Sequence, residues 1–115
     1  MQIREIMDRQ KEFDLQHQGK TPFFEKISDE NIHVLEHLLV CLVGEVGEVS
    51  NITKKIVRGD EELTLLTTRQ DIAEELADVF IYLIKICNQL DVDLEKEFIR
   101  KLEINEKRFK HYEGK

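Results

Sequence analysis

The chain has 115 residues, with 24 acidic and 17 basic side chains and a formal net charge of −7. Such an acidic balance argues against a nucleic-acid binder or an anionic-membrane binder, because it provides no excess of cations to displace counterions from phosphates. A charged fraction of 36% with one proline and five glycines is typical of a helical bundle, and the length suits one domain. We therefore expect an all-α domain spanning residues 1–115, with no nucleic-acid or membrane partner.

Breaks around Gly19, Gly59 and Asp91 divide the chain into four predicted helices. Thr68 with Asp71 resembles a capping box at the start of the third helix, and Asp93 is the expected N-cap of the fourth. The expected ranges are about 2–17, 29–58, 68–90 and 94–112.

The second and third helices each carry an apolar stripe at helical spacing, and they are joined by a loop of about nine residues. Stripes of this kind on consecutive helices predict an antiparallel hairpin packed along its length. The stripe residues are Leu38, Leu42, Val49, Ile52 and Ile56 in the second helix, and Ile72, Leu76, Val79, Leu83, Ile86 and Leu90 in the third. The first helix has an apolar side that includes Ile3, Ile6, Met7 and Phe13.

Cys41 and Cys87 lie within these apolar segments and are expected to be buried free thiols in a reducing compartment. The first residues alternate charged and apolar side chains, so no secretory signal peptide is predicted. No uncharged stretch of 18 residues occurs, so no membrane span is predicted either. The cytoplasm is the expected location.

Two pairs of carboxylates occupy matching positions on the hairpin, Glu45 with Glu48 and Glu75 with Asp78. Residues three apart share a helix face, and a rotation of about 100° per residue places both pairs on the same side of an antiparallel hairpin. Four clustered carboxylates repel one another unless a cation joins them, and oxygen ligands select Mg²⁺, with Mn²⁺ as a substitute. The alternative is a pair of solvated helix faces in a highly charged chain.

A polar stripe on the fourth helix combines Lys101, Asn105 and Arg108 at i, i+4 and i+7. Arginine, lysine and amide donors suit phosphate oxygens. A solvated face, with Glu97 pairing Lys101, is the alternative. Lys54, Lys55 and Arg58 add positive charge to the second helix, either for phosphates or as plain surface residues near its C-terminus.

Four ordered motifs resemble the all-α nucleoside triphosphate pyrophosphohydrolases, and more narrowly their MazG-like branch, which includes the dCTP pyrophosphatase type. The resemblance covers about residues 30–110. It is carried by Leu42-Val43-Gly44-Glu45-Val46-Gly47-Glu48-Val49, by Glu74-Glu75-Leu76-Ala77-Asp78-Val79, by Asp91-Val92-Asp93-Leu94, and by Lys101, Asn105 and Arg108.

This resemblance implies Mg²⁺-dependent hydrolysis of a (deoxy)nucleoside triphosphate to the monophosphate and pyrophosphate, in nucleotide-pool cleaning. The metal ligands would be Glu45, Glu48, Glu75 and Asp78. Either Glu45 or Glu48, with Glu48 favoured, would orient the attacking water. Phosphates would bind Lys101, Asn105 and Arg108. Lys54 is a further candidate phosphate contact because of its positive charge on the second helix.

The chain departs from the family pattern near the nucleobase. Lys54 and Lys55 replace a Gln-Trp pair, and the sequence contains no tryptophan. Phe23, Phe24 and His33 are candidate base contacts, although the two phenylalanines also suit a hydrophobic lid or an oligomer contact.

The long hairpin leaves apolar surface for another copy, and the resemblance also implies an oligomeric helical bundle, so a homodimer or homotetramer is expected. Two other functions remain open: a non-catalytic nucleotide-binding or partner-binding helical module, and a purely structural dimerisation module.

Overall fold

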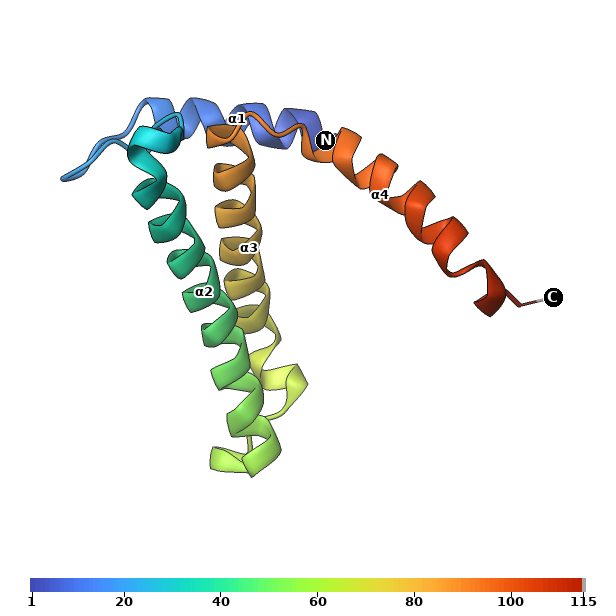
Figure 1. Cartoon of the computed structure of the whole chain (residues 1–115). Coiled ribbons are helices and arrows are strands. Elements are labelled where there is room, and N and C mark those ends of the chain that lie inside the picture. Colours follow the sequence, from blue (N-terminus) through green and yellow to red (C-terminus); the bar gives the residue numbers. More distant parts are fainter. Residues whose placement is uncertain (115) are drawn as a thin grey trace.

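The structure, a computed structural model, describes residues 1–114, and over that range its regular elements are all helices. The all-α prediction is therefore confirmed (Figure 1). The four α-helices are α1 (Ile3–Leu15), α2 (Ile32–Arg58), α3 (Leu65–Gln89) and α4 (Leu94–Arg108), and the short 3₁₀ turns are Asp29–Asn31, Asp60–Glu62 and Lys110–Tyr112.

The turn between α2 and α3 is shorter than predicted. Helix α2 ends at Arg58 and is capped by Gly59, whose φ of 83° is left-handed and therefore suits glycine. Helix α3 begins at Leu65, where the Thr64 hydroxyl accepts a hydrogen bond from the Thr67 amide. The predicted capping box of Thr68 with Asp71 is wrong, because Thr64 with Thr67 forms the capping box one turn earlier and Thr68 is already inside the helix.

The beginning of α4 agrees with the sequence pattern. Asp93 accepts a hydrogen bond from the Lys96 amide at 3.1 Å, which confirms it as the N-cap. The same carboxylate accepts a hydrogen bond from Arg4 at 2.6 Å. These bonds hold the pKa of Asp93 below its usual range, with the Lys96 amide contributing most.

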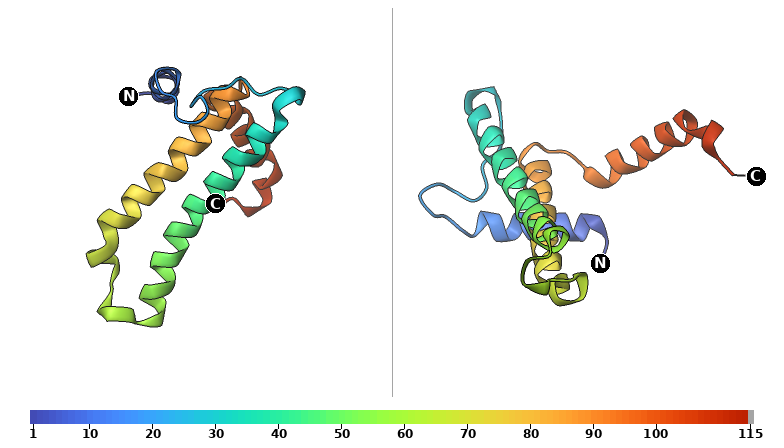
Figure 2. Two further views of the ribbon diagram at one scale, coloured as in Figure 1. Left: turned by 90° about the vertical axis from the view of Figure 1, so that its left-hand side faces the viewer. Right: turned by 90° about the horizontal axis from the view of Figure 1, so that it is seen from below.

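Helices α2 and α3 run antiparallel, side by side along their length (Figures 1 and 2). The half-buried or buried side of α3 includes Ile72, Glu75, Val79, Tyr82 and Ile86. The predicted stripe is therefore rotated, because Leu76, Leu83 and Leu90 on its other edge are exposed. Glu75 thus lies within the interhelical face rather than at its border.

The buried core lies at one end of the hairpin, where α1 crosses α3 (Figure 1). Met7 from α1 packs there against Ile84 and Cys87 from α3. Phe13 was expected on the same apolar side but is half exposed, and its ring stacks on His17 instead. Of the two cysteines expected to be buried, Cys87 is buried and Cys41 is partly exposed.

The segment between α1 and α2 is anchored to α3 by two polar side chains, the partly buried Lys85 and the buried Gln89. Lys85 donates to the Asp14 carboxylate at 3.0 Å and to the Phe23 carbonyl at 3.3 Å. Gln89 donates to the same carbonyl and accepts a hydrogen bond from the Glu25 amide. These contacts fix residues 16–28 beside the upper half of the hairpin.

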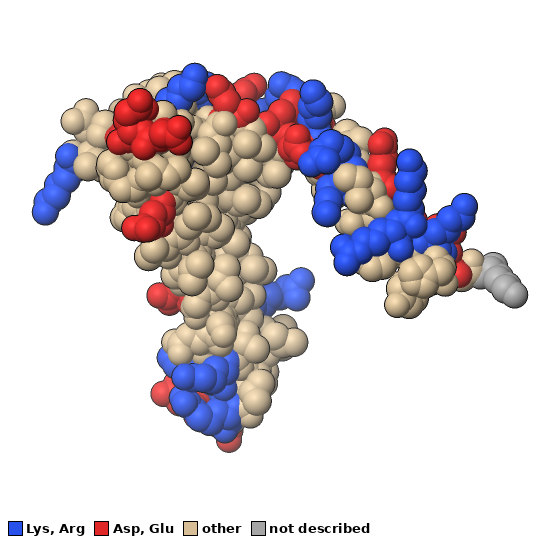
Figure 3. Space-filling view, viewed as in Figure 1, with Lys and Arg blue, Asp and Glu red and all other residues tan. Residues whose placement is uncertain are grey.

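The single chain is extended. Its Cα radius of gyration is 17.8 Å, whereas a compact domain of this length has about 13 Å. Its accessible surface is 9187 Å², about 2,600 Å² above that of a compact protein of the same mass. Figure 3 shows that much of the exposed hairpin carries no charge. Within residues 1–114, no helix is both long and apolar enough to span a membrane.

Candidate metal centre

Three carboxylates from the two hairpin helices converge at one point. Glu45 of α2 lies opposite Glu75 and Asp78 of α3, and one oxygen of each lies within 4.8 Å of the other two. The convergence follows from the antiparallel packing, because all three residues lie on or beside the helix faces that meet. The structure thus brings together three of the four predicted metal ligands.

Electrostatic repulsion within this cluster is visible at Glu75. Partial desolvation raises the pKa of its carboxyl, and a side-chain hydrogen bond with Glu45 raises it further. The negative charges of Glu45, Glu48 and Asp78 act in the same direction. The cluster therefore favours either a proton or a cation at this position.

Glu48 lies outside the group of three. It is exposed, although its charge is close enough to contribute to the raised pKa of Glu75. Glu48 lies one turn beyond Glu45 on the same helix. Its role as a metal ligand or as the residue that orients water stays a prediction.

Tyr82 is a member of the site that sequence analysis missed. Desolvation raises the pKa of its hydroxyl, followed by the effects of Cys41, Glu45 and Asp78. The phenol therefore stays protonated and can donate a hydrogen bond near the carboxylates. The available signal was its spacing, because Tyr82 follows Asp78 by four residues and shares its helix face.

The donor set fits a hard divalent cation. All three converging ligands are carboxylate oxygens, which Mg²⁺ and Mn²⁺ prefer. In an octahedral magnesium site the oxygens lie about 3.0 Å apart when adjacent and about 4.2 Å when opposite. Small side-chain rotations would close the present spacing of at most 4.8 Å to these values.

A cavity of about 580 Å³ lies beside the cluster, between the anchored segment and the upper hairpin. Tyr82 lines this cavity and is also close to Glu45 and Asp78, so it connects the two regions. Of the candidate base contacts, Phe23 and His33 line the cavity, and Phe24 does not. A volume of this size suits a small organic ligand.

The predicted phosphate-binding residues lie elsewhere in the chain. Lys101, Asn105 and Arg108 are on α4, which projects away from the hairpin (Figures 1 and 2). The expected alternative partner of Lys101, Glu97, instead pairs with Arg100 at 2.9 Å. Lys54 is exposed near the turn of the hairpin, where it helps lower the pKa of Asp60. A single chain therefore does not bring these cations to the carboxylates.

Comparison with known proteins gives one family. The model of the MazG nucleotide pyrophosphohydrolase domain matches residues 33–112, which include all of α3 and α4 and nearly all of α2. The matched range contains the carboxylate cluster and the cationic residues of α4.

Similar proteins support the same family. Gene 37 protein of Mycobacterium phage L5 is 40% identical over 63 residues, covering 55% of each chain. Human dCTP pyrophosphatase 1 is 35% identical over 82 residues, 70% of this chain and 48% of that protein, and its Rattus norvegicus counterpart is 34% identical with the same coverage. The chain thus spans about half the length of the curated relatives it matches. No solved structure gave a significant match.

Proposed function

The chain belongs to the MazG nucleotide pyrophosphohydrolase family, and from that membership we propose that it hydrolyses (deoxy)nucleoside triphosphates to monophosphate and pyrophosphate in a Mg²⁺-dependent reaction. The observation that carries the proposal is the convergence of Glu45, Glu75 and Asp78 from two helices. We further propose that it cleans the nucleotide pool in the cytoplasm.

Each site residue has a specific part in this reaction. Glu45, Glu75 and Asp78 would hold Mg²⁺, which when bound neutralises phosphate charge and activates a water. Glu48, exposed one turn from Glu45, would complete the ligand set or accept a proton from the attacking water. The protonated Tyr82 hydroxyl would donate to a phosphate or carboxylate oxygen.

The cavity beside Tyr82 would receive the nucleoside. Phe23 offers an aromatic face there, and Lys85 lies over the same ring at 5.2 Å. His33 provides a ring that can donate or accept a hydrogen bond. With dCTP pyrophosphatase 1 among the relatives, deoxycytidine triphosphate is the first substrate to test.

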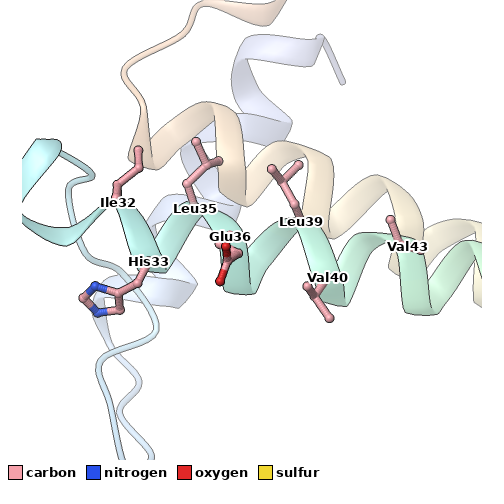
Figure 4. Close-up of a pocket in the computed structure, with 7 residues that line it drawn as sticks. All are labelled: Ile32, His33, Leu35, Glu36, Leu39, Val40 and Val43. Atoms are coloured by element: carbon pink, nitrogen blue, oxygen red, sulfur yellow. The ribbon is translucent and has the colours of Figure 1, made fainter.

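We also propose that the active form is a homodimer or homotetramer. The excess surface of about 2,600 Å² per chain exceeds the roughly 800 Å² that each partner buries in a standard interface. Apolar side chains of α2 lie exposed in a row, among them Ile32, Leu39 and Val43 (Figure 4). Light scattering at micromolar chain concentration tests this, and a monomer would refute it.

The activity test is a panel of single nucleoside triphosphates with Mg²⁺ or Mn²⁺, read by separation of the products. We expect monophosphate and pyrophosphate, and a loss of at least about a hundredfold in Glu48→Gln and Asp78→Asn. Release of orthophosphate, or unchanged turnover in both variants, would contradict the proposal. Glu74→Gln, an exposed neighbour outside the cluster, is the matched control and should stay active.

A non-catalytic nucleotide-binding module is the second candidate. The same carboxylates and cavity would support it, since binding needs the cluster but no activated water. Calorimetric binding of a triphosphate with no product after long incubation would favour this module over an enzyme.

A further inference from the structure

His37 and Cys41 form a side-chain pair on α2, shortly before the carboxylate cluster in the chain. The Cys41 sulfur lies 3.6 Å from Nε2 of His37, and the two residues are four apart, so they share one face of the helix. His37 is exposed and Cys41 is partly exposed, which leaves the pair open to an ion from solvent. The proposed hydrolysis assigns no part to either side chain.

The separation of these two atoms is the one that a shared zinc ion requires. Zinc in proteins is tetrahedral, with bonds of about 2.3 Å to sulfur and about 2.0–2.1 Å to nitrogen. At a tetrahedral angle, these bonds place the sulfur and the nitrogen about 3.5–3.6 Å apart. The observed 3.6 Å therefore allows Cys41 and His37 to bind one ion after small side-chain rotations.

The donor types distinguish the pair from the carboxylates that follow it. A thiolate and an imidazole suit zinc and other transition metals, whereas Mg²⁺ prefers oxygen ligands and is not a competitor for sulfur. The cluster of Glu45, Glu75 and Asp78 offers oxygen alone. Neighbouring positions on the hairpin therefore favour ions of different kinds.

The surroundings of the pair supply what a two-ligand ion still needs. His37 and Tyr82 line the cavity of about 580 Å³ beside the cluster, which gives water access to the remaining coordination positions. The Tyr82 hydroxyl also lies beside Cys41. A hydroxyl donor next to a metal-bound sulfur is the kind of supporting contact that orients and stabilises a metal ligand.

Cys87 has none of these features. It is 6% exposed and packs against Met7 and Ile84 in the core. Burial raises the pKa of its thiol, which disfavours the thiolate that a metal would bind. The two thiols of the chain therefore differ in accessibility and in neighbours, and Cys87 serves as an internal control for Cys41.

We propose that His37 and Cys41 bind a zinc ion, and that zinc bound there inhibits the enzyme. Zinc replaces the thiol proton of Cys41, which leaves for solvent, so binding adds one net positive charge. Glu45 follows Cys41 by about one helical turn, so this charge opposes the binding of Mg²⁺ at the cluster. The inhibitory part rests on the proposed function, whereas the zinc site itself does not.

Cobalt(II) is the probe for the site, because zinc has no visible spectrum and a cobalt–thiolate bond gives a charge-transfer band in the near ultraviolet. Titration of the whole chain with Co²⁺ under an inert atmosphere should produce this band, and added Zn²⁺ should remove it by displacing cobalt. Cys41→Ala should lose the band, and His37→Gln should bind cobalt at least about tenfold more weakly. No band in the wild type, or a band retained in Cys41→Ala, would overturn the site.

Two control variants separate this site from the rest of the chain. Cys87→Ala removes the other thiol, and the double variant Glu75→Gln/Asp78→Asn removes two of the cluster carboxylates. Both should keep the cobalt band, and its loss in either variant would contradict the assignment to His37 and Cys41. Circular dichroism establishes that each variant keeps its helix content.

The inhibitory part is tested by triphosphate hydrolysis in excess Mg²⁺, with and without one equivalent of Zn²⁺ per chain. Zinc should inhibit the wild type and Cys87→Ala, while Cys41→Ala should match the wild type without zinc and lose the inhibition. Equal inhibition of the wild type and Cys41→Ala would overturn this part, because zinc would then act elsewhere. A wild type that is inactive without zinc refutes the proposed function instead, and the cobalt band still decides the zinc site.

Discussion

Replacing Lys85 by methionine should destabilise the protein strongly, although Lys85 lies outside the carboxylate cluster. Its side chain is 11% exposed and its ammonium group lies 3.0 Å from Asp14, which is 1% exposed. Within the described residues, the second carboxylate oxygen of Asp14 is buried without a hydrogen-bond partner. Methionine preserves most of the side-chain volume, so the change removes mainly the charge.

The expected cost is about 3 kcal/mol in the free energy of unfolding. Removing one partner of a buried ion pair typically costs about 3–5 kcal/mol, because the remaining charge stays buried without compensation. The lower end applies here because Gln10 still donates to Asp14 at 3.1 Å. Replacing both partners, as Asp14→Leu with Lys85→Met, should return stability to within about 1 kcal/mol of the wild type.

Urea unfolding followed by circular dichroism, at one fixed chain concentration, measures these differences. Arg100→Met is the matched control, because it breaks the exposed pair with Glu97 and should cost less than about 1 kcal/mol. Trypsin gives a second readout, since Lys20 and Lys26 lie in the anchored segment and should be cut faster in Lys85→Met. A cost for Lys85→Met no larger than that of Arg100→Met would refute the reasoning.

Three further predictions concern the cluster, the apolar face and the turn. Because the pKa of Glu75 is raised by desolvation and by Glu45, its contribution to the stability of the metal-free protein should be lost as pH rises above about 4.5, the ordinary value for a glutamate. In thermal unfolding, Glu75→Gln should therefore gain stability relative to the wild type as pH rises, and a difference that does not change with pH would contradict this reasoning. Val43→Glu on the exposed apolar side of α2 should lower the assembled mass in light scattering, whereas Asn51→Glu on the polar side should not; equal effects would argue against that side as the interface. Gly59→Ala should cost about 1 kcal/mol in urea unfolding because its φ is 83°, whereas Gly47→Ala inside α2 should not destabilise, and equal costs would exclude the backbone explanation.

Much of the local structure could be predicted because it depends on neighbouring residues. Asp93 before an amphipathic run defined the start of α4, and the structure gives the predicted capping bond. The prediction of where α3 begins was wrong for a local reason too, because Thr64 and Thr68 each begin a possible capping pattern. Leu65 and Leu66, in the first turn of the helix, are exposed. Hydrophobicity thus did not mark the first turn.

The orientation of α3 was harder to predict, because apolar side chains occur on more than one of its faces. Leu76 and Leu83 were assigned to the hairpin contact, but both are exposed, and Glu75 and Tyr82 lie on the interhelical face instead. Sequence periodicity cannot distinguish an apolar helix face that packs against the same chain from an apolar face that the single chain leaves exposed. The carboxylate convergence was still predicted, since the spacing of Glu75 and Asp78 is independent of this rotation.

The placement of α4 was outside the reach of sequence reasoning for a different reason. Its direction is set by the contacts of Val92 and Leu94 with residues of α1 and α3, which are distant in sequence. The cationic residues were identified by type and spacing, but their distance from the carboxylates depends on those contacts.

Helix α3 separates the requirements of folding from those of chemistry along its own length. Its C-terminal turns, with Ile84 and Cys87, form the core with α1, while Glu75 and Asp78 lie more than one turn away toward its N-terminus. Substitutions around the cluster therefore disturb few buried contacts, and substitutions in the core leave the carboxylate spacing intact. The chemistry of the carboxylate cluster can therefore change while the C-terminal half of α3 keeps the chain folded.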